Sequence, residues 1–318
     1  MSIDSIAKEF HFRRFVPDTD LSQLVLLLNA AEAVDHSGED LSEEALRDQL
    51  TWPGHDPLLD RWVVEAPDDQ GQLIGFSSVW KPPSIEHAYF TAVVHPSWRR
   101  RGIGSDLLIR SIVRSKELSA TQVLVYADVS HLAANAFLRK RGFWPVASYT
   151  QMELKADIHL DTPAWTAGYA VRNYNTIQHF PTLLHALNRS YQGLWGQHWL
   201  TDEDLANELP NLTLDGTFLL YAPGDEVVGF CRAEISDQLS VRRGKRTGYI
   251  DSPEVVPEHR GDGLYLPLLL YAAQWVRTQE LVDIELESWG DDEQTIALYQ
   301  KAGFSIVKKE AIYKWDLS

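Results

Sequence analysis

A basic turn that contains two glycines is the segment whose residue types point most directly to chemistry. It reads Arg99-Arg100-Arg101-Gly102-Ile103-Gly104-Ser105 and lies between an apolar stretch and an amphipathic one. Backbone N–H groups at the start of a helix point toward one place, where the helix dipole adds partial positive charge. Glycine lets an anion approach the backbone, and arginine supplies charge and hydrogen-bond donors. The turn therefore predicts a phosphate-binding site; the structural alternative is a basic turn with ordinary helix caps.

An altered copy of this turn follows 161 residues later and indicates an internal repeat. At this offset Arg99 aligns with Arg260, and Gly102 aligns with Gly263. The flanking matches are Val94 and Pro96 with Val255 and Pro257, Lys140 with Lys301, and Gly142-Phe143 with Gly303-Phe304. Chance would hardly supply these residues in order and in register. We therefore predict a tandem duplication, with domains at residues 1–154 and 169–318 and a polar, turn-rich linker at 155–168.

Each half is predicted to have the same α+β architecture, in which a mixed, mostly antiparallel, twisted sheet is flanked by helices. The expected strands are 11–15, 61–65, 73–79, 86–94 and 122–127, then 169–174, 217–221, 227–234, 246–255 and 283–288, and each half closes with a strand pair through Leu154 or Leu317. The expected helices are 21–31, one that starts after Ser42, 102–116 and one that ends before Gly142, with counterparts at 177–186, after Thr201, at 263–278 and before Gly303. Ser42 and Thr201 suit helix N-caps. The two glycines suit the positive φ of helix C-caps.

The turn and the later Gly142-Phe143 pair together resemble the GNAT superfamily of N-acetyltransferases, whose signature is Gln/Arg-x-x-Gly-x-Gly/Ala at the pyrophosphate of acetyl-CoA. The resemblance covers nearly the whole chain, once in each half, and indicates a tandem two-domain member. It implies acetyl-CoA as the acyl donor, with its pantetheine arm between strands four and five. The residues that it implies for acetyl-CoA binding are Ala92, Val93, Val94, Arg99, Arg100, Arg101, Gly102, Ile103, Gly104 and Ser105.

The resemblance also implies direct attack of an acceptor amine on the thioester. A lysine-type ammonium has a pKa of about 10.4, so a carboxylate or His, often acting through water, must remove its proton. Glu86 and His87, at the start of strand four, are the candidate bases of the first half. The structural alternatives are an exposed strand-end charge and a hairpin surface residue. Leu138 stands where the family has a Tyr that helps the thiolate leave, and His131 replaces a frequent Asn.

The second half keeps a Tyr that the first half lacks, but it lacks turn residues that the first half keeps. Tyr299 occupies the position of the family's acid, although it could equally be a packed helix aromatic. Tyr265 stands where the family has Gly or Ala, and Asp262 stands where the first half has Arg101. A carboxylate near a pyrophosphate repels it, so we expect weak or absent CoA binding in this half. Asp251 and Tyr249 are its candidate bases, and both could be structural.

Two segments could line the acceptor site, because in this fold the connection between the first two helices walls it. Residues 188–199 are rich in aromatics and glycine, which suits stacking on a ring or a sugar, or enclosing a cation; packing between domains is the alternative. Residues 32–40 are acidic and could attract an amine or form a solvated loop. The basic run 242–246 is expected at a solvated hairpin tip.

Composition excludes several other classes. The chain has 318 residues and a formal charge of −16, which disfavours binding to nucleic acid or anionic membranes and mildly favours a cationic acceptor. Cys231 is the single cysteine and is expected to be buried; a disulfide framework is ruled out. The histidines show no metal-ligand spacing, so no metal is predicted. We read no signal peptide and expect a cytoplasmic protein.

The sequence therefore predicts an acetyl-CoA-dependent N-acetyltransferase that modifies the primary amine of a small molecule, with its cofactor in the N-terminal domain. The alternatives are a non-catalytic acyl-CoA-binding or scaffolding protein, and catalysis in the C-terminal domain at Tyr299. Nothing in the sequence indicates the oligomeric state or identifies the acceptor.

Overall fold

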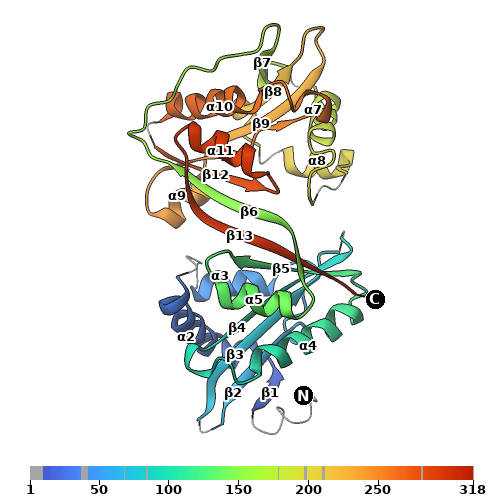
Figure 1. The fold of residues 1–318 in the computed structure, drawn as a ribbon, viewed down its shortest axis with the longest axis vertical. Coiled ribbons are helices and arrows are strands. Elements are labelled where there is room, and N and C mark those ends of the chain that lie inside the picture. The colour runs from blue at the N-terminus through green and yellow to red at the C-terminus, as the bar shows by residue number, and fades with distance from the viewer. Residues whose placement is uncertain are drawn as a thin grey trace. The chain divides into compact units, whose positions relative to one another are not determined.

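The computed structural model describes residues 10–36, 42–67, 69–83, 85–177, 179–196, 199–209, 212–280 and 282–317. The chain folds into two compact units (Figure 1). Unit 1 comprises Met1–Val146 and Ala311–Ser318, and unit 2 comprises Ala147–Glu310.

The division into units differs from the predicted boundaries because the last strand of each half continues into the other unit. Strand β6 (Trp144–Leu154) belongs to unit 2 from Ala147 onward, where it pairs with β12 (Asp283–Trp289). Strand β13 (Ser305–Asp316) belongs to unit 1 from Ala311 onward. Each half therefore ends in one long strand rather than the expected strand pair, and residues 311–318 complete unit 1.

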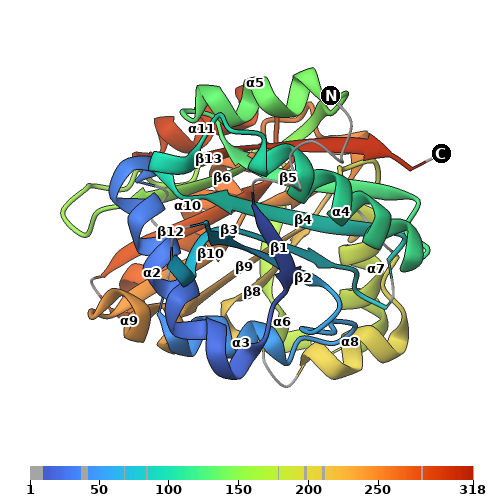
Figure 2. The ribbon, with the colours of Figure 1, turned by 90° about the horizontal axis from the view of Figure 1, so that it is seen from below.

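Unit 1 contains a sheet in the order β1-β2-β3-β4-β5-β13. Its other strands are β1 (His11–Arg14), β2 (Arg61–Ala66), β3 (Asp69–Trp80), β4 (His87–Val94) and β5 (Gln122–Asp128). Strands β1 to β4 are antiparallel neighbours, whereas β4 and β5 are parallel. The helices are α2 (Pro17–Asp35), α3 (Glu43–Leu50), α4 (Ile103–Glu117) and α5 (Leu132–Lys140). Figure 2 shows α2 and α3 on one face of this sheet and α4 and α5 on the other.

Unit 2 repeats this plan in the order β6-β12-β10-β9-β8-β7. Its strands are β7 (Ala170–Asn173), β8 (Thr217–Tyr221), β9 (Val227–Ile235), β10 (Thr247–Asp251) and the short β11 (Glu254–Val255), which pairs with β9. Its helices are α6 (Tyr174–Ile177), α7 (Phe180–Ser190), α8 (Asp202–Glu208), α9 (Asp237–Arg243), α10 (Tyr265–Gln279) and α11 (Glu293–Lys301). Separate apolar clusters form under α10 and α11 and under α7 and α8. The predicted α+β architecture of two tandem domains is confirmed.

Several local predictions hold. The Ser42 side chain accepts a hydrogen bond from the Ala45 N–H, and Thr201 forms a reciprocal capping box with Asp204. Gly142 and Gly303 follow α5 and α11 with φ of +88° and +101°. These glycines set the turn that leads from each helix into the last strand.

Two local predictions are wrong. The run 242–246 does not form a hairpin tip: α9 begins after Ser236, whose side chain accepts a hydrogen bond from the Leu239 N–H, and ends at Arg243, with Gly244 as its C-cap. The expected strand 246–255 is interrupted at residues 252–253, which separates β10 from β11. Two basic side chains of this run are paired, because Arg243 contacts Glu285 and Lys245 contacts Asp283.

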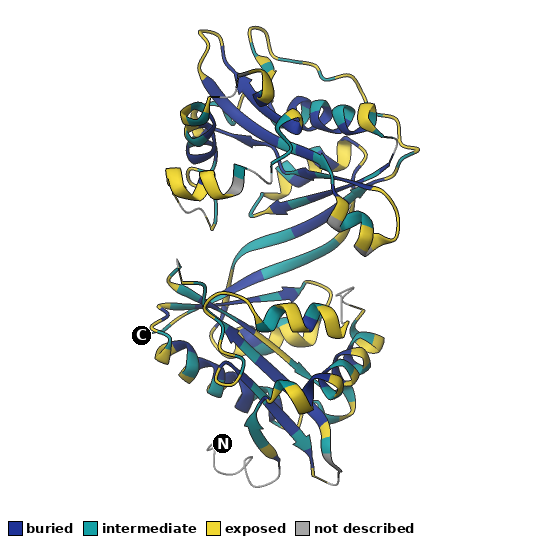
Figure 3. Ribbon diagram, turned by 180° about the vertical axis from the view of Figure 1, so that it is seen from behind, coloured by how far each residue is buried: buried dark blue, intermediate teal, exposed yellow. Residues whose placement is uncertain are grey.

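Burial follows the sheets, whose central strands are buried while the helices expose their outer faces (Figure 3). Cys231 on β9 is fully buried, as expected, and burial raises the pKa of its thiol. None of the described helices has the length and apolar character that crossing a membrane requires.

Candidate functional site

The basic turn of unit 1 forms a backbone cradle between β4 and α4. A short 3-10 helix (Pro96–Trp98) follows β4, and the turn then passes through Arg100 at φ +65° and Gly102 at φ +93°. The first hydrogen bonds of α4 are donated by Ser105 and Asp106 to the Gly102 carbonyl, at 2.9 and 3.2 Å. The N–H groups of Gly102, Ile103 and Gly104 are those that a helix start leaves without an internal acceptor. Such groups can donate to a bound anion, and the predicted phosphate site at this turn stays a prediction.

Arg99 has a different position from the one expected of a phosphate ligand. Its Nε donates to the Val94 carbonyl at 3.0 Å, and its Nη atoms donate to the two carboxylate oxygens of Asp35 at 2.8 and 2.5 Å. Asp35 is the last residue of α2. Arg99 therefore fixes the turn against β4 and α2, and its guanidinium is already paired.

The remaining positive charge of the turn is exposed. Arg100 and Arg101 are both exposed, and the Arg101 guanidinium lies over the Trp98 ring at 4.6 Å. Arg141, the residue after α5, donates a hydrogen bond to the Ser105 hydroxyl. Sequence analysis missed Arg141, although its place directly before the Gly142-Phe143 pair could have indicated it. Arg141 therefore contacts the start of α4, and Arg100 and Arg101 are exposed basic residues of the turn itself.

Strand β4 separates from β5 halfway along its length. The two strands pair only where His87, Ala88 and Tyr89 meet Gln122, Val123 and Leu124, whereas β4 continues to Val94. On its other side β4 remains paired with β3 as far as Val94. Thr91 and Ala92 are exposed, and Val93 and Val94 are half-buried. The predicted residues 92–94 therefore present a backbone edge that an extended chain could pair with.

The equivalent strand of unit 2 is closed. Strand β10 pairs with β12 over its full length, and the Ser252 N–H still donates to the Glu287 carbonyl at 3.3 Å. Residues 252–256, which correspond to 91–95 of unit 1, are all buried. The pairing of β10 with β12 ends at Asp251, so residues 253–255, which correspond to the edge 92–94, are distinguished from that edge by their burial and not by pairing with β12.

The turn of unit 2 is closed as well. Arg260 donates to three carbonyls, those of Val255 at 3.0 Å, Ser190 at 3.2 Å and Gln192 at 2.6 Å. Tyr265, at the position of Gly104, packs against the apolar core, and burial raises the pKa of its hydroxyl to about 12.

A carboxylate adds to this closure. Asp262 accepts hydrogen bonds from the Tyr169 hydroxyl at 2.6 Å and from the His259 ring at 3.0 Å. The unit 2 turn therefore combines a bulky side chain with a negative charge where unit 1 has a glycine and an arginine.

Tyr299 lies in the core of unit 2 rather than at an opening. It is fully buried, and its hydroxyl donates to Asp291 Oδ2 at 3.0 Å, which also accepts from Ser288 Oγ at 2.6 Å. Burial raises the pKa of Tyr299 and that of Asp291. The neighbouring Glu254 is buried too, and burial raises the pKa of its carboxyl.

Asp251, the other candidate of this half, is engaged by its neighbours. It accepts a hydrogen bond from the Tyr249 hydroxyl at 2.7 Å and pairs with Arg232 Nε at 2.7 Å. Burial, followed by the charges of Asp251 and Glu287, raises the pKa of Tyr249. These contacts link β10 to β9, in line with the structural alternative for Asp251 and Tyr249.

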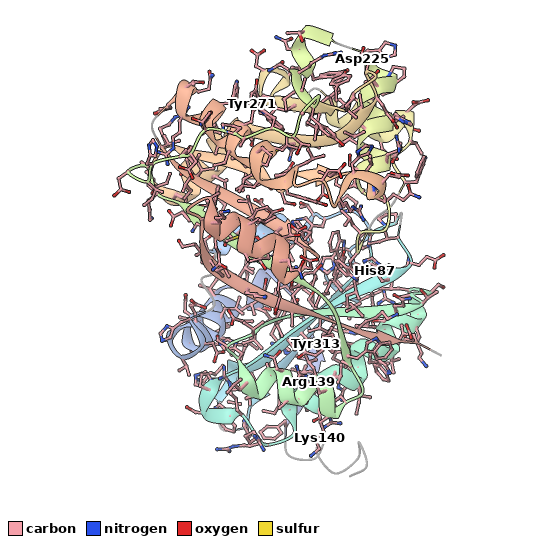
Figure 4. The ribbon with its side chains drawn as sticks, turned by 45° about the horizontal axis from the view of Figure 1, so that its top comes forward. His87, Arg139, Lys140, Asp225, Tyr271 and Tyr313 are labelled. Carbon is pink, nitrogen blue, oxygen red and sulfur yellow. The ribbon has the colours of Figure 1, made fainter. Side chains whose placement is uncertain are left out.

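The candidate bases of unit 1 lie at the start of β4. Glu86 is exposed, and its backbone carbonyl accepts from the Thr121 N–H at 2.8 Å. The ring of His87 is half-buried, and its Nε2 lies 3.0 Å from the Tyr89 hydroxyl (Figure 4). Burial, and then the charge of Lys81, lowers the pKa of His87. Leu138, at the position of the family's Tyr, is a buried core residue.

Aromatic rings continue from His87 across the sheet, and sequence analysis missed them. Tyr89 stacks with Trp80 of β3 at 5.4 Å between ring centroids, and Trp80 contacts Trp52 at 4.8 Å. On the other side Tyr89 contacts Tyr126 of β5 at 6.0 Å. The alternation of β4, which places residues 87, 89 and 91 on one face, could have indicated this row.

The two expected acceptor segments are only partly described. In the segment 188–199, the Asn188 side chain forms hydrogen bonds with the backbone N–H and carbonyl of Leu200 and so joins the two ends of the segment. Trp199 is exposed, and residues 197 and 198 lie outside the described residues. Of residues 32–40, Asp35 pairs with Arg99, His131 bonds the Asp35 carbonyl, and residues 37–40 lie outside the described residues. Among the described residues, no group of His, Cys, Asp and Glu side chains could hold a metal ion.

Comparison with known proteins gives three kinds of match: a family model, similar sequences and a similar solved structure. The family model described as "Acetyltransferase (GNAT) family" matches residues 26–143 and again residues 180–304. The mycothiol acetyltransferase of Amycolatopsis mediterranei is 26% identical over 250 residues, which are 74% of this chain and 78% of the relative. That of Streptomyces coelicolor is 24% identical over 322 residues, with 99% and 96% covered. The crystal structure of a GCN5-related N-acetyltransferase from Sphaerobacter thermophilus superposes with a TM-score of 0.75 at 20% identity, covering 97% of this chain and 96% of that one.

Proposed function

Since this chain belongs to the acetyltransferase (GNAT) family and is an N-acetyltransferase that uses acetyl-CoA, we propose that unit 1 binds the acetyl-CoA and transfers its acetyl group to a primary amine of a small molecule. The observation that carries this proposal is the contrast between the two units. Unit 1 has an exposed β4 edge and a glycine at position 104 of its turn, whereas unit 2 buries the corresponding residues and carries Tyr265, packed against the apolar core, at the position of that glycine. The same ancestral site is thus kept in one half and closed in the other.

In this proposal the residues of unit 1 divide the binding of acetyl-CoA among themselves. The N–H groups of Gly102, Ile103 and Gly104 hold the pyrophosphate at the positive end of α4. Arg100, Arg101 and Arg141 add charge, and Arg99 fixes the turn through Asp35. The open edge of residues 90–94 pairs with the pantetheine arm, which directs the thioester toward the closed end of the β4–β5 gap. Acetyl-CoA supplies the activated acyl group that the amine attacks.

The acceptor class rests on the family and on charge. The chain's formal charge of −16 favours approach of a cationic amine through long-range attraction. Two fused units in one chain also resemble mycothiol synthase in architecture, in line with the relatives named mycothiol acetyltransferase. The proposal is tested by acetyl transfer from acetyl-CoA to a panel of spermidine, glucosamine and an alanyl peptide. Turnover of at least one amine supports it; acetyl-CoA binding without turnover on any of them contradicts it.

Removal of Arg141 is expected to weaken acetyl-CoA binding without slowing chemistry. An exposed charge-assisted contact is worth about 1 kcal/mol, so Arg141→Ala should raise the Kd for acetyl-CoA about 3- to 10-fold and leave kcat unchanged. The effect should shrink at high salt. Lys140→Ala, one residue away on an exposed side chain, is the matched control and should leave the Kd unchanged. Equal effects of the two substitutions would remove Arg141 from the site.

Substitution of Tyr299 is expected to affect stability and not acetyl transfer. Tyr299→Phe removes a buried hydroxyl from Asp291, which costs about 1–3 kcal/mol of folding free energy. Thermal unfolding measures that loss, and steady-state kinetics should give a kcat within about twofold of the wild type. A kcat reduced by about 100-fold in a variant with an unchanged Tm would instead place the chemistry in unit 2.

A further inference from the structure

A hydrogen-bonded chain of three side chains crosses the β4–β5 gap at the point where the strands separate. His87 and Tyr89 lie on the same face of β4, and His87 Nε2 is 3.0 Å from the Tyr89 hydroxyl. Tyr126 of β5 contacts Tyr89, with the ring centroids 6.0 Å apart, and a side-chain hydrogen bond from Tyr126 counteracts the effect of burial on the pKa of Tyr89. The chain therefore runs from an imidazole, through one phenol, to a second phenol on the neighbouring strand.

The three side chains lie at the closed end of the gap between β4 and β5. Tyr89 and Leu124 are the last residues paired between β4 and β5, and Tyr126 is two residues further along β5. The next β4 residue on the same face, Thr91, is exposed. If the pyrophosphate is held at the other end of this edge, beside Gly102, an extended pantetheine arm along β4 points its thioester toward Tyr89 and Tyr126.

Packing fixes the orientation of the Tyr89 phenol. Trp80 and Tyr89 are directly paired across β3 and β4, and their rings are stacked. Trp80 is anchored in turn by a hydrogen bond of 3.0 Å from its Nε1 to the Pro53 carbonyl. The core residues Ala88 and Phe90, which alternate with His87 and Tyr89, hold the strand from its other face. A hydrogen-bonded chain that is held in this way needs little rearrangement to transfer a proton.

The surroundings of His87 and Tyr89 suit these two residues to different steps of a proton transfer. The lowered pKa of His87 keeps its ring neutral at pH 7, in the form that accepts a proton. Burial raises the pKa of Tyr89, so its hydroxyl stays protonated. The titratable and charged groups around His87 are Lys81, Tyr89 and the adjacent Glu86, whose side chain is exposed.

We propose that His87 is the final acceptor of the proton that the acceptor ammonium must lose, and that the hydroxyls of Tyr126 and Tyr89 relay this proton to it. The proposal rests on the proposed function and assigns that function's base. The ammonium gives one proton to Tyr126 while Tyr126 gives its own to Tyr89 and Tyr89 gives its own to His87 Nε2. The freed amine forms a C–N bond with the thioester carbon, and the C–S bond breaks. The second nitrogen proton goes to the departing thiolate, and the imidazolium later releases its proton to water.

The test compares wild type, His87→Gln, Tyr89→Phe and the double variant, using acetyl-CoA and the panel amine that the wild type acetylates. A lost general base costs about 10²–10⁴-fold, so each single variant should lower kcat/KM at pH 7 about 100-fold while the Kd for acetyl-CoA stays unchanged. The double variant should be about as slow as either single variant, because both remove the same relay. His159→Gln, an exposed histidine of unit 2, is the control and should have no effect.

The pH profile distinguishes a relay from structural damage. A base must be deprotonated, so wild-type kcat/KM should fall as the pH drops below the lowered pKa of His87, and His87→Gln should lose this step. The rate ratio of wild type to His87→Gln should shrink toward alkaline pH, where the amine loses its proton without help. A ratio that is constant with pH, multiplicative losses in the double variant, or a 100-fold loss in Glu86→Gln would each overturn the relay. A wild type that acetylates no panel amine would instead overturn the proposed function.

Discussion

Gly104→Tyr is expected to abolish acetyl-CoA binding while the protein stays folded. A Cβ at position 104 would meet only the Val94 side chain, at 3.8 Å, so the backbone accepts a larger residue. We expect the added phenol to cover the N–H groups at the start of α4; the equivalent residue of unit 2, Tyr265, packs beside its turn against the apolar core. We expect the Kd for acetyl-CoA to rise by at least about 100-fold, because both the close approach of the phosphate and its backbone donors are lost. Calorimetric titration and ligand-dependent thermal shift measure this change.

Two matched variants control this result. Gly104→Ala places only a methyl group beside Val94 and should bind acetyl-CoA within about threefold of the wild type, since that contact is ordinary van der Waals packing. Tyr265→Gly reopens the turn of unit 2 and should leave wild-type acetyl-CoA binding unchanged, because the site of unit 1 is untouched. Acetyl-CoA binding that survives in Gly104→Tyr, or that disappears in Tyr265→Gly, would contradict the assignment to unit 1.

Tyr313→Ala is expected to unfold unit 1, although residue 313 belongs to the second sequence repeat. Tyr313 is fully buried in the apolar cluster beneath α4 and α5, and its hydroxyl donates to Asn135 at 2.8 Å (Figure 4). The same hydroxyl accepts a hydrogen bond from Arg139 Nε at 3.2 Å. Truncation of a large buried aromatic costs about 3–5 kcal/mol, a large part of the 5–15 kcal/mol that typically stabilises a domain. Acetyl-CoA binding should therefore be lost through unfolding of its site.

Hydrogen exchange identifies which unit is affected. In Tyr313→Ala the amides of β4 and α4 should lose protection, and those of β9 and α10 should keep it. Tyr313→Phe keeps the ring but leaves the Asn135 side chain without its donor, so we expect a smaller loss of about 1–2 kcal/mol with acetyl-CoA binding retained. Asp316→Ala, on an exposed side chain of the same strand, should change neither property. Loss of protection in unit 2 instead would contradict the exchange of the last strands.

The sequence predicts the elements of each half well because their signals are local. The caps at Ser42 and Thr201, the positive φ of Gly142 and Gly303, and the basic turn before α4 all depend on residues a few positions apart. The continuation of β6 into unit 2 and of β13 into unit 1 could not be predicted from such local signals. A long strand with suitable alternation can extend into either unit, and nothing local to residues 311–316 states which partner strand it will meet.

The candidate site was predicted in outline but not in the roles of its side chains. Arg99 belongs to the turn as expected, yet its guanidinium is held by Asp35, 64 positions earlier in the chain. Tyr126 contacts Tyr89 from the neighbouring strand β5, and only the folded structure reveals that proximity. Tyr299 has the expected sequence position but lies in the core, because burial depends on packing that its neighbours in sequence do not specify.

Hydrogen–deuterium exchange of the wild-type protein with and without acetyl-CoA tests the central claim most directly, since it locates the bound ligand in one unit or the other. We expect acetyl-CoA to protect the amides of residues 90–105 and to leave those of residues 251–266 unchanged. Protection of residues 251–266, alone or together with 90–105, would contradict the account that unit 1 alone has kept the ancestral site.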